Sequence, residues 1–554
     1  MILRTTNGGV SWSEFSPDLS TKDPSRIVSS GGIVGDNLGQ FYGEVVFSIA
    51  PSDVQKGLIW AGTNDGKVWY TKDAGKNWND VTKNITGLPV WGVVSKIEPS
   101  HFDAGTAYIA VDFHLMDNRD PWVYKTTDFG KTWSKISDTL PKGGPLTYAR
   151  VVAENPNRKG NVFVGTGNAI YYTLDDGAHW KQLKQGLPAA PVSWIVVQKQ
   201  AHDLVLSTYG RGMFIMEDIT ALEQGVMEDA PGSAVAKLVT PRPAYRTVRG
   251  QARALLGFWV KAAPAKPVEF EILDAKGAVI KKLPSVTAHP GLNRTSWDLR
   301  YDPPVLVALR TTPPENPHIW EEPRFQGQDT RAITHWGLAQ AEVGPIAAPG
   351  KYTVRMTVDG QSFTQPLEIL RTADSHADDA ALQSSVRLQL KVRDDITQVS
   401  SMTNQLEWMR RQLEDESKTN ADKASLIKLI ADINKKLEDV EYQLITRADA
   451  LSDDKYFQTA YNLYQNFLWL NGEIGKGAGD VQGSGDWGAT ETAIGLVLDL
   501  ERTLDKVKTE YKGVMDRDVP AYNKAIEGTA LKPLKTTGAP PPPARQGGRF
   551  GGGQ

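Results

Sequence analysis

The fold of this chain is decided by a turn with the sequence TKDAGKNW at residues 71–78. The same pattern returns as TTDFGKTW at 126–133 and as TLDDGAHW at 173–180, and a weaker copy, TTNGGVSW, stands at 5–12. Each copy reads Ser/Thr-x-Asp/Asn-x-Gly-x-x-Trp and joins two short apolar runs. This pattern predicts a tight β-hairpin turn in every copy.

Each conserved position of the turn has a physical role. The acidic side chain can accept backbone N–H bonds within its own turn, and the glycine can adopt the positive φ that tight hairpins require. The tryptophan is expected to leave the turn and pack against the neighbouring unit. We therefore assign a structural role to the following residues: Asp73, Gly75, Trp78, Asp128, Gly130, Trp133, Asp175, Gly177 and Trp180.

The spacing of the copies predicts a repeat architecture. They recur roughly 45 to 65 residues apart with about four apolar runs per unit, which is typical of β-propeller blades. The first unit, at about 1–20, holds only half a blade, and the last, at 192–219, lacks the turn. The sequence thus predicts a partial Asp-box β-propeller of about four and a half blades over residues 1–220.

The turn resembles the Asp box of the bacterial neuraminidase repeat. The runs GLIWAGTNDG (57–66), PWVYKTTDFGKTW (121–133) and STYGRGMFI (207–215) are similar to the sortilin-like Asp-box proteins that bacteria export, many of which are named glycosyl hydrolases. This resemblance covers about residues 1–371. It implies an extracytoplasmic location, periplasmic or secreted, and further blades N-terminal to this point, so that the chain would be the C-terminal part of such a protein.

The start of the chain, MILRT, lacks the pattern of a signal peptide and reads as the end of a strand within a blade. We therefore expect a fragment or an internal start. Either an N-terminal segment of the propeller completes the ring, or residues 4–12 close onto the last unit as a five-bladed ring.

Composition excludes several classes of function. The 554 residues carry a net charge of -3, so no basic field attracts nucleic acid or anionic lipid. No apolar run approaches the ~20 residues that cross a bilayer. The absence of cysteine excludes disulfides, thiolate metal sites and a cysteine nucleophile. We expect neither a cofactor nor a metal, and no nucleic-acid partner.

The pattern changes after residue 220. We predict a linker at 221–250, an immunoglobulin-like β-sandwich at 251–372 with a Pro-rich insertion at 302–348, and a helical bundle at 376–532. The bundle is expected because apolar residues alternate three and four apart in several runs. The Pro- and Gly-rich tail, 533–554, is expected to be disordered.

Topology directs the search for a ligand site. The Asp-box turns join the third and fourth strands of a blade, so the connections at the opposite edge are the expected ligand face. The loop at 112–120 is longer than its counterparts, and extra length on one face of a repeat array is typical of a binding face. The candidate ligand-binding residues are Trp91, His114, Arg119, Tyr209 and Arg211. The candidate catalytic carboxylates are Glu44, Asp65, Asp117 and Asp120.

We interpret the chain as an exported bacterial propeller protein that binds a polymer, either a glycan or a peptide, through this face. A first alternative is a glycoside hydrolase that uses two of the candidate carboxylates, since such hydrolysis needs a pair of them. A second alternative is a scaffold subunit of a surface assembly, with a homo-oligomer as one form of it. The sequence leaves the question of enzymatic activity open.

Overall fold

We describe the chain from a computed structural model. The structure describes residues 1–26, 44–184, 186–226, 234–247, 252–313, 316–323, 325–333, 341–446, 460–475 and 486–540. It divides into two compact units. Unit 1 comprises 1–242, 257–264 and 288–294, and unit 2 comprises the remainder.

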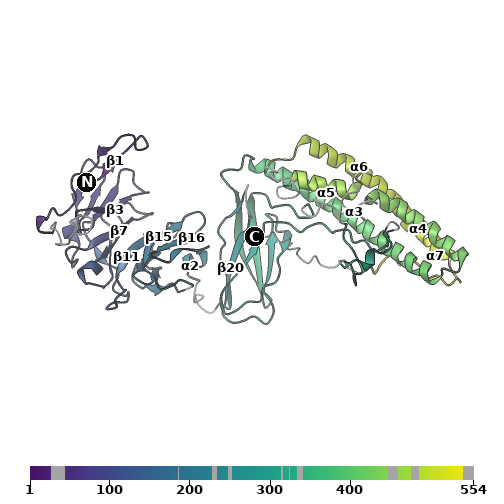
Figure 1. The fold of residues 1–554 in the computed structure, drawn as a ribbon, viewed down its shortest axis with the longest axis horizontal. Coiled ribbons are helices and arrows are strands. Elements are labelled where there is room, and N and C mark those ends of the chain that lie inside the picture. The colour runs from purple at the N-terminus through teal and green to yellow at the C-terminus, as the bar shows by residue number, and fades with distance from the viewer. Residues whose placement is uncertain are drawn as a thin grey trace. The chain divides into compact units, whose positions relative to one another are not determined.

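Unit 1 contains three antiparallel sheets of four strands each, which we call blades I to III (Figure 1). Blade I consists of β3 (Val46–Pro51), β4 (Ile59–Thr63), β5 (Val68–Thr71) and β6 (Asn79–Asp80). Blade II consists of β7 (Val93–Pro99), β8 (Ala107–Asp112), β9 (Trp122–Thr126) and β10 (Ser134–Lys135). Blade III consists of β11 (Ala149–Glu154), β12 (Val162–Thr166), β13 (Ile170–Thr173) and β14 (Lys181–Gln182).

Two smaller sheets flank these blades. Blade IV has only β15 (Val192–Gln198), β16 (Asp203–Thr208) and β17 (Gly212–Met216), and β1 (Leu3–Arg4) forms a hairpin with β2 (Ser13–Glu14). The first strands follow one another, because β3 contacts β7, β7 contacts β11 and β11 contacts β15. This arrangement of sheets is a partial propeller, as the sequence predicts. The five-bladed closure is wrong for the described residues, because β1 and β2 pair with each other and the apolar residues around them, Ile2, Phe15 and Leu19, pack on blade I.

The four copies of the repeated motif, at 5–12, 71–78, 126–133 and 173–180, form turns with the same hydrogen bonds; we call them the repeat turns. In the second copy, Thr71 Oγ1 donates to Asp73 Oδ1 at 2.8 Å and accepts from the N–H of Gly75 at 3.0 Å, while Asn77 N–H donates to Asp73 Oδ1 at 2.9 Å. The copies at 5–12, 126–133 and 173–180 repeat this set. The side chains of each turn thus satisfy its own backbone donors.

The tryptophan of each strong copy packs on the preceding sheet. Trp78 Nε1 donates to the carbonyl of Phe15 at 3.3 Å, and Trp180 Nε1 donates to the carbonyl of Ile136 at 2.7 Å. The ring of Trp133 lies edge-on to Trp60 of blade I, with 6.1 Å between ring centroids. These contacts join each blade to the one before it.

Two further sheets are formed by strands that follow the last blade and precede the first long helix in the sequence. The first contains β18 (Ala236–Leu238), β20 (Ala254–Val260) and β23 (Gly291–Trp297). The second contains β19 (Ala244–Arg246), β25 (Gln361–Arg371), β24 (Gly350–Val358), β21 (Glu269–Leu273) and β22 (Val279–Lys282), with β19 parallel to β25. The expected linker at 221–250 is therefore wrong in part, because it contains β18 and β19. Residues 227–233 and 248–250 of it lie outside the described part.

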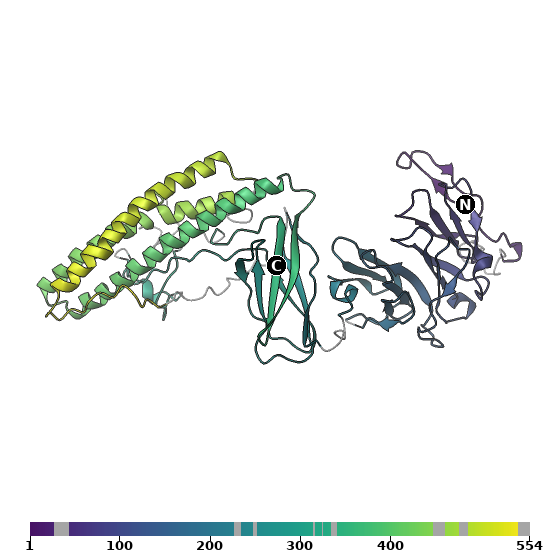
Figure 2. The same ribbon diagram turned by 180° about the vertical axis from the view of Figure 1, so that it is seen from behind.

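The C-terminal region is helical and its long helices run side by side in both views (Figures 1 and 2). It consists of α3 (Asp379–Thr419), α4 (Ala424–Leu444), α5 (Leu463–Ile474), α6 (Glu491–Gly513), a π-helical turn (Val514–Asp518) and α7 (Val519–Ala525). Short helices elsewhere are α2 (Thr220–Glu223) and the 3-10 turns Pro24–Arg26, Thr82–Asn84, His114–Met116 and Ile319–Glu321. None of the helices in the described ranges has a stretch apolar and long enough to cross a bilayer.

The Pro-rich insertion is bound to α3. The carboxylate of Glu407 accepts hydrogen bonds from the backbone of Arg310 and Thr311 and from the Thr311 hydroxyl, and Glu414 likewise holds both groups of Thr312. The tail is also held in part, since Lys535 N–H donates to Gln412 Oε1 at 3.0 Å. Disorder from residue 533 onward is therefore wrong for 533–540, while 541–554 and Trp336 lie outside the described part.

Removing Trp180 tests whether the repeat-turn tryptophans hold successive blades together. Trp180→Ala should lower the free energy of unfolding by about 3 kcal/mol, because it removes a packed aromatic side chain and a hydrogen bond. Trp12→Ala is the matched control: Trp12 holds the same position in the first copy but is 59% exposed, so its loss should stay within about 0.5 kcal/mol. Thermal unfolding monitored by circular dichroism measures both, and equal melting temperatures for the two variants would refute this role.

Acid should weaken the repeat turns. Backbone and side-chain hydrogen bonds from Asn77 lower the pKa of Asp73 from 3.8 to about 2. Burial acts to raise the pKa of Asp175, but bonds from Thr173 and His179 outweigh it and lower that pKa also to about 2. Because both folded pKa values lie below the ordinary one, the ionised carboxylates stabilise the fold above about pH 4, and this contribution is lost as the pH falls towards 2.

Melting temperatures of the wild type and of Asp73→Asn and Asp175→Asn, recorded between about pH 6 and pH 2.5, test this loss. Each variant should melt below the wild type at pH 6, and the difference should shrink in acid. A difference that stays constant with pH would show that the carboxylate charge is unimportant.

Candidate functional site

The candidate residues lie on the connections opposite the repeat turns. The β4–β5 turn carries Asp65, the β8–β9 loop carries residues 113–121, and the β16–β17 turn carries Tyr209 and Arg211. The two edges of a blade differ in what they contact. Ala74, in a repeat turn, donates its N–H to Gly57 between β3 and β4, whereas Gly66 in the β4–β5 turn lies against Trp91 and Gly92 before β7.

Asp65 is bound to the chain itself. It is only 2% exposed, and its Oδ2 atom accepts from the N–H and the hydroxyl of Thr21, both at 2.8 Å, and from the N–H of Glu44 at 3.4 Å. The backbone of Glu44 has a positive φ of 70°. In the described structure Asp65 therefore anchors the two ends of the connection between residues 21 and 44, and its carboxylate faces protein rather than solvent.

The β8–β9 loop carries an ordered set of side chains. The 3-10 turn His114–Met116 begins after Asp112, whose Oδ1 atom lies 2.7 Å from Nδ1 of His114. The imidazole stacks on the ring of Tyr148, with 4.7 Å between centroids and 20° between planes. Tyr148 comes from the link between β10 and β11, so this stacking joins two neighbouring blades.

Arg119 lies in the same loop and crosses to the same link. Its NH1 group donates to the carbonyl of Pro145 at 3.2 Å, and its own carbonyl accepts from the Thr147 hydroxyl at 2.7 Å. NH2 lies 3.8 Å from Oδ1 of Asp117, whose side chain is 98% exposed. The side chain of Arg119 remains 40% exposed, so the guanidinium is held on one side and open to solvent on the other.

Asp120 closes the loop. Its Oδ1 atom accepts from the N–H of Gly143 at 3.1 Å, and its N–H donates to Asn118 Oδ1 at 3.1 Å. The contacts thus gather His114, Asp117, Arg119, Asp120 and Tyr148, which we call the 114–120 patch. The sequence analysis did not single out Tyr148. This residue stands directly before β11, the first strand of blade III, and Trp91 stands shortly before β7, the first strand of blade II.

The remaining candidates lie elsewhere on this face. Tyr209 is 76% exposed and its N–H donates to the carbonyl of Pro191, while Arg211 is exposed and Trp91 is half-buried with a positive φ of 65°. The hydrogen bonds of Tyr209 and Asp65 go to Pro191, Thr21 and Glu44, which do not belong to the 114–120 patch. The described ranges contain no cluster of three His, Asp or Glu side chains suited to a metal ion.

Comparisons with known proteins give partial similarities. No family model matches the chain. Over 115 residues it is 30% identical to an oligoxyloglucan-reducing end-specific xyloglucanase of Emericella nidulans, a match that covers 20% of this chain and 13% of that protein. The structure of YCF48 bound to D1 peptide aligns with 17% identity and a TM-score of 0.22, over 39% of this chain and 64% of that one.

The GH74 xyloglucanase of Xanthomonas campestris aligns with 14% identity and a TM-score of 0.25, over 62% of this chain and 47% of that one. The chain therefore spans less than two thirds of the length of each of these three proteins.

Proposed function

We propose that the blades bind an extended peptide or polymer through the 114–120 patch, on the edge opposite the repeat turns. The observation that carries this proposal is the state of Arg119. The Pro145 carbonyl and Asp117 fix one side of its guanidinium, and the other side is open to solvent. A guanidinium fixed in this way can form bidentate hydrogen bonds to a carboxylate at a low cost in side-chain entropy.

The neighbouring groups suit the same class of ligand. The ring of His114 is held by Asp112 and stacks on the buried ring of Tyr148, so its outer face, with the side chain 28% exposed, forms a fixed flat surface beside the loop. Flat rings next to a cation bind extended ligands that carry both apolar and anionic groups. An acidic peptide or an anionic glycan meets both requirements, and a neutral ligand loses the contact to Arg119.

Titration calorimetry with a peptide panel and a glycan panel, each with acidic and neutral members, tests the proposal. Arg119→Ala should weaken the best acidic ligand about tenfold, since it removes a charge-assisted contact. Lys131→Ala is the matched control, because it removes one positive charge from the repeat turn at the opposite edge of the same blade. If both variants weaken ligand binding equally, or if Arg119→Ala does not weaken it, the ligand binds elsewhere than at the 114–120 patch.

A glycoside hydrolase is the second candidate, supported by the sequence similarity to a xyloglucanase over 115 residues. Hydrolysis of a glycoside needs two carboxyl groups on either side of the bond. Asp117 and Asp120 are the candidates that share one loop; Glu44 is half-buried but precedes β3, and Asp65 is only 2% exposed.

For this activity, the wild type should release reducing ends from xyloglucan. Asp117→Asn or Asp120→Asn should lower the rate of release by more than about 100-fold. Lys131→Ala should keep full activity. A wild type that releases no sugar from a glycan panel excludes the hydrolase.

We further infer an extracytoplasmic location, an immunoglobulin-like class for the two sheets after the blades, and membership of the sortilin-like Asp-box proteins. The repeat turns and the motifs at 57–66, 121–133 and 207–215 support the membership and the location, and the arrangement of residues 236–371 in two sheets supports the immunoglobulin-like class. Fractionation of the source cells with an antibody against the chain tests the location. A solution mass above that of one chain would instead support the scaffold role.

A further inference from the structure

Blade IV differs from the other blades at its outer edge. Its strand β17 pairs with β16 alone, and within the described part of the chain no fourth strand and no repeat turn follow it. The chain instead continues into the short helix α2. The outer edge of β17 therefore presents backbone N–H and C=O groups that have no strand partner, and such an edge can pair with an added strand.

The other junctions show what normally occupies the place beside such an edge. In blade II, Ile109 pairs with Tyr124 across β8 and β9, and Trp133 packs with this pair and with Val81 of blade I in one apolar cluster. In blade III, Val164 pairs with Tyr171, and Trp180 packs with them and with Ile136 of blade II. The tryptophan in each case comes from the repeat turn just before the fourth strand.

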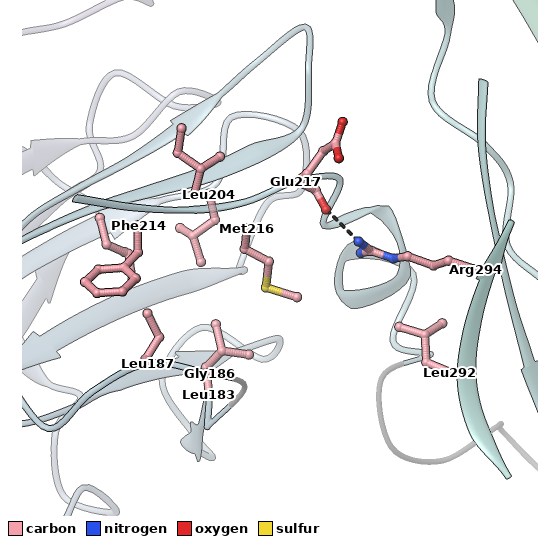
Figure 3. Close-up of a pocket in the computed structure, with 11 residues that line it drawn as sticks. Leu183, Gly186, Leu187, Leu204, Phe214, Met216, Glu217, Leu292 and Arg294 are labelled. Carbon is pink, nitrogen blue, oxygen red and sulfur yellow. Dashed lines mark hydrogen bonds between the residues drawn. The ribbon is translucent and has the colours of Figure 1, made fainter. Parts of the chain in front are cut away.

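The corresponding place between blades III and IV is a cavity. Leu206 pairs with Phe214 across β16 and β17, as Ile109 pairs with Tyr124, and Leu183 follows β14 as Val81 follows β6. These three side chains line a cavity of about 520 Å³ together with Leu187 and Met216 (Figure 3). The volume is sufficient for a tryptophan side chain and part of a backbone.

One end of the cavity is fixed by an arginine of the same unit. Arg294 donates from NH1 to the carbonyl of Glu217 at 2.9 Å (Figure 3). It also donates from NH2 to the carbonyl of Asp218 at 2.6 Å. These bonds hold the chain where it leaves β17. The strand edge and the cavity therefore keep their relative position without any ligand.

We propose that this site binds an extended peptide of a partner protein, which adds to β17 as the fourth strand of blade IV and inserts a tryptophan between Leu183, Leu206 and Phe214. The edge of β17 supplies main-chain hydrogen bonds, and the cavity selects the aromatic side chain. The site shares no residue with the 114–120 patch, so it is independent of the function proposed above.

The chain itself supplies a suitable probe. The peptide TTDFGKTWSKIS, residues 126–137, forms the repeat turn and fourth strand of blade II. Added to the intact chain with a fluorescent label, it should bind with a Kd below about 1 mM, and the peptide with Trp133→Ala should bind at least about tenfold more weakly. Hydrogen exchange should slow at the backbone amides of residues 212–216 in the complex.

A variant pair locates the binding. Leu187→Asp places a charge at the half-buried rim of the cavity and should weaken the labelled peptide at least about tenfold. Val90→Asp is the control, since Val90 is 79% exposed outside the cavity, and it should bind as the wild type does. Matching melting temperatures of the two variants show that Leu187→Asp retains the fold.

Four results would overturn the proposal. They are no binding at about 1 mM, equal binding of the two peptides, slowed exchange only outside β17, and a loss of binding that Val90→Asp shares. Sedimentation of the chain alone distinguishes another occupant. A dimer that Leu187→Asp dissociates would show that a second copy fills the site in place of a partner peptide.

Discussion

The packing of one tryptophan per repeat turn on the preceding sheet is the interaction on which unit 1 depends. A β-sheet of four short strands has two faces to bury, and strands of two residues, such as β6 or β14, contribute little area of their own. Trp78, Trp133 and Trp180 supply that area from the turn. Because Asp73, Asp128 and Asp175 satisfy the turns internally, the rings are presented at the same place in each blade.

Because each blade depends on a neighbour to cover its faces, the two ends of the array expose apolar side chains. Phe47 and Ile49 of β3 are 57% and 53% exposed, and Ile49 shares its face with Ala61, which packs against the β1–β2 hairpin. At the other end, Trp194 of β15 is 47% exposed and Ile215 of β17 is 67% exposed. In the middle of the array each blade has a neighbour on both sides, and there the equivalent faces are covered.

Sequence predicted the blades and the helices because both follow from local periodicity. The repeat turns placed β5, β9 and β13, and the apolar spacing from Ile396 to Leu413 placed α3. It did not predict the positive φ of Ala74, Phe129 and Asp176 beside the turn glycines, since alanine and phenylalanine at this position have no side chain that favours it. Strands β18 and β19 were missed because three residues carry no measurable alternation and β19 pairs with β25, more than a hundred residues away.

The candidate site was predicted less well than the fold. The loop at 112–120 was found from its length, and Arg119 from its charge. That Asp65 is buried could not be read from sequence, because its partner Thr21 lies 44 residues earlier and carries no motif. The role of Tyr148 depends on the packing of two blades, and no pattern within either blade records it.

The bonds between the Pro-rich insertion and α3 bear on how the C-terminal half could fold. Glu407 and Glu414 are separated from their partners by about a hundred residues, so the insertion can dock only after α3 exists. Within α3, Arg410 is 8% exposed and pairs with Glu407, Glu438 and Glu441. Three carboxyl groups thus share one guanidinium, and burial raises the pKa of Glu441 well above its ordinary value.

A polypeptide cut before α3 would keep the helices from α3 to α7 yet leave the carboxylate of Glu407 without the backbone donors of Arg310 and Thr311. Unpaired acidic groups beside an arginine that is already shared are costly in a helical core. The insertion therefore stabilises the helices once they have formed, and a segment of this half that keeps these bonds begins before residue 310.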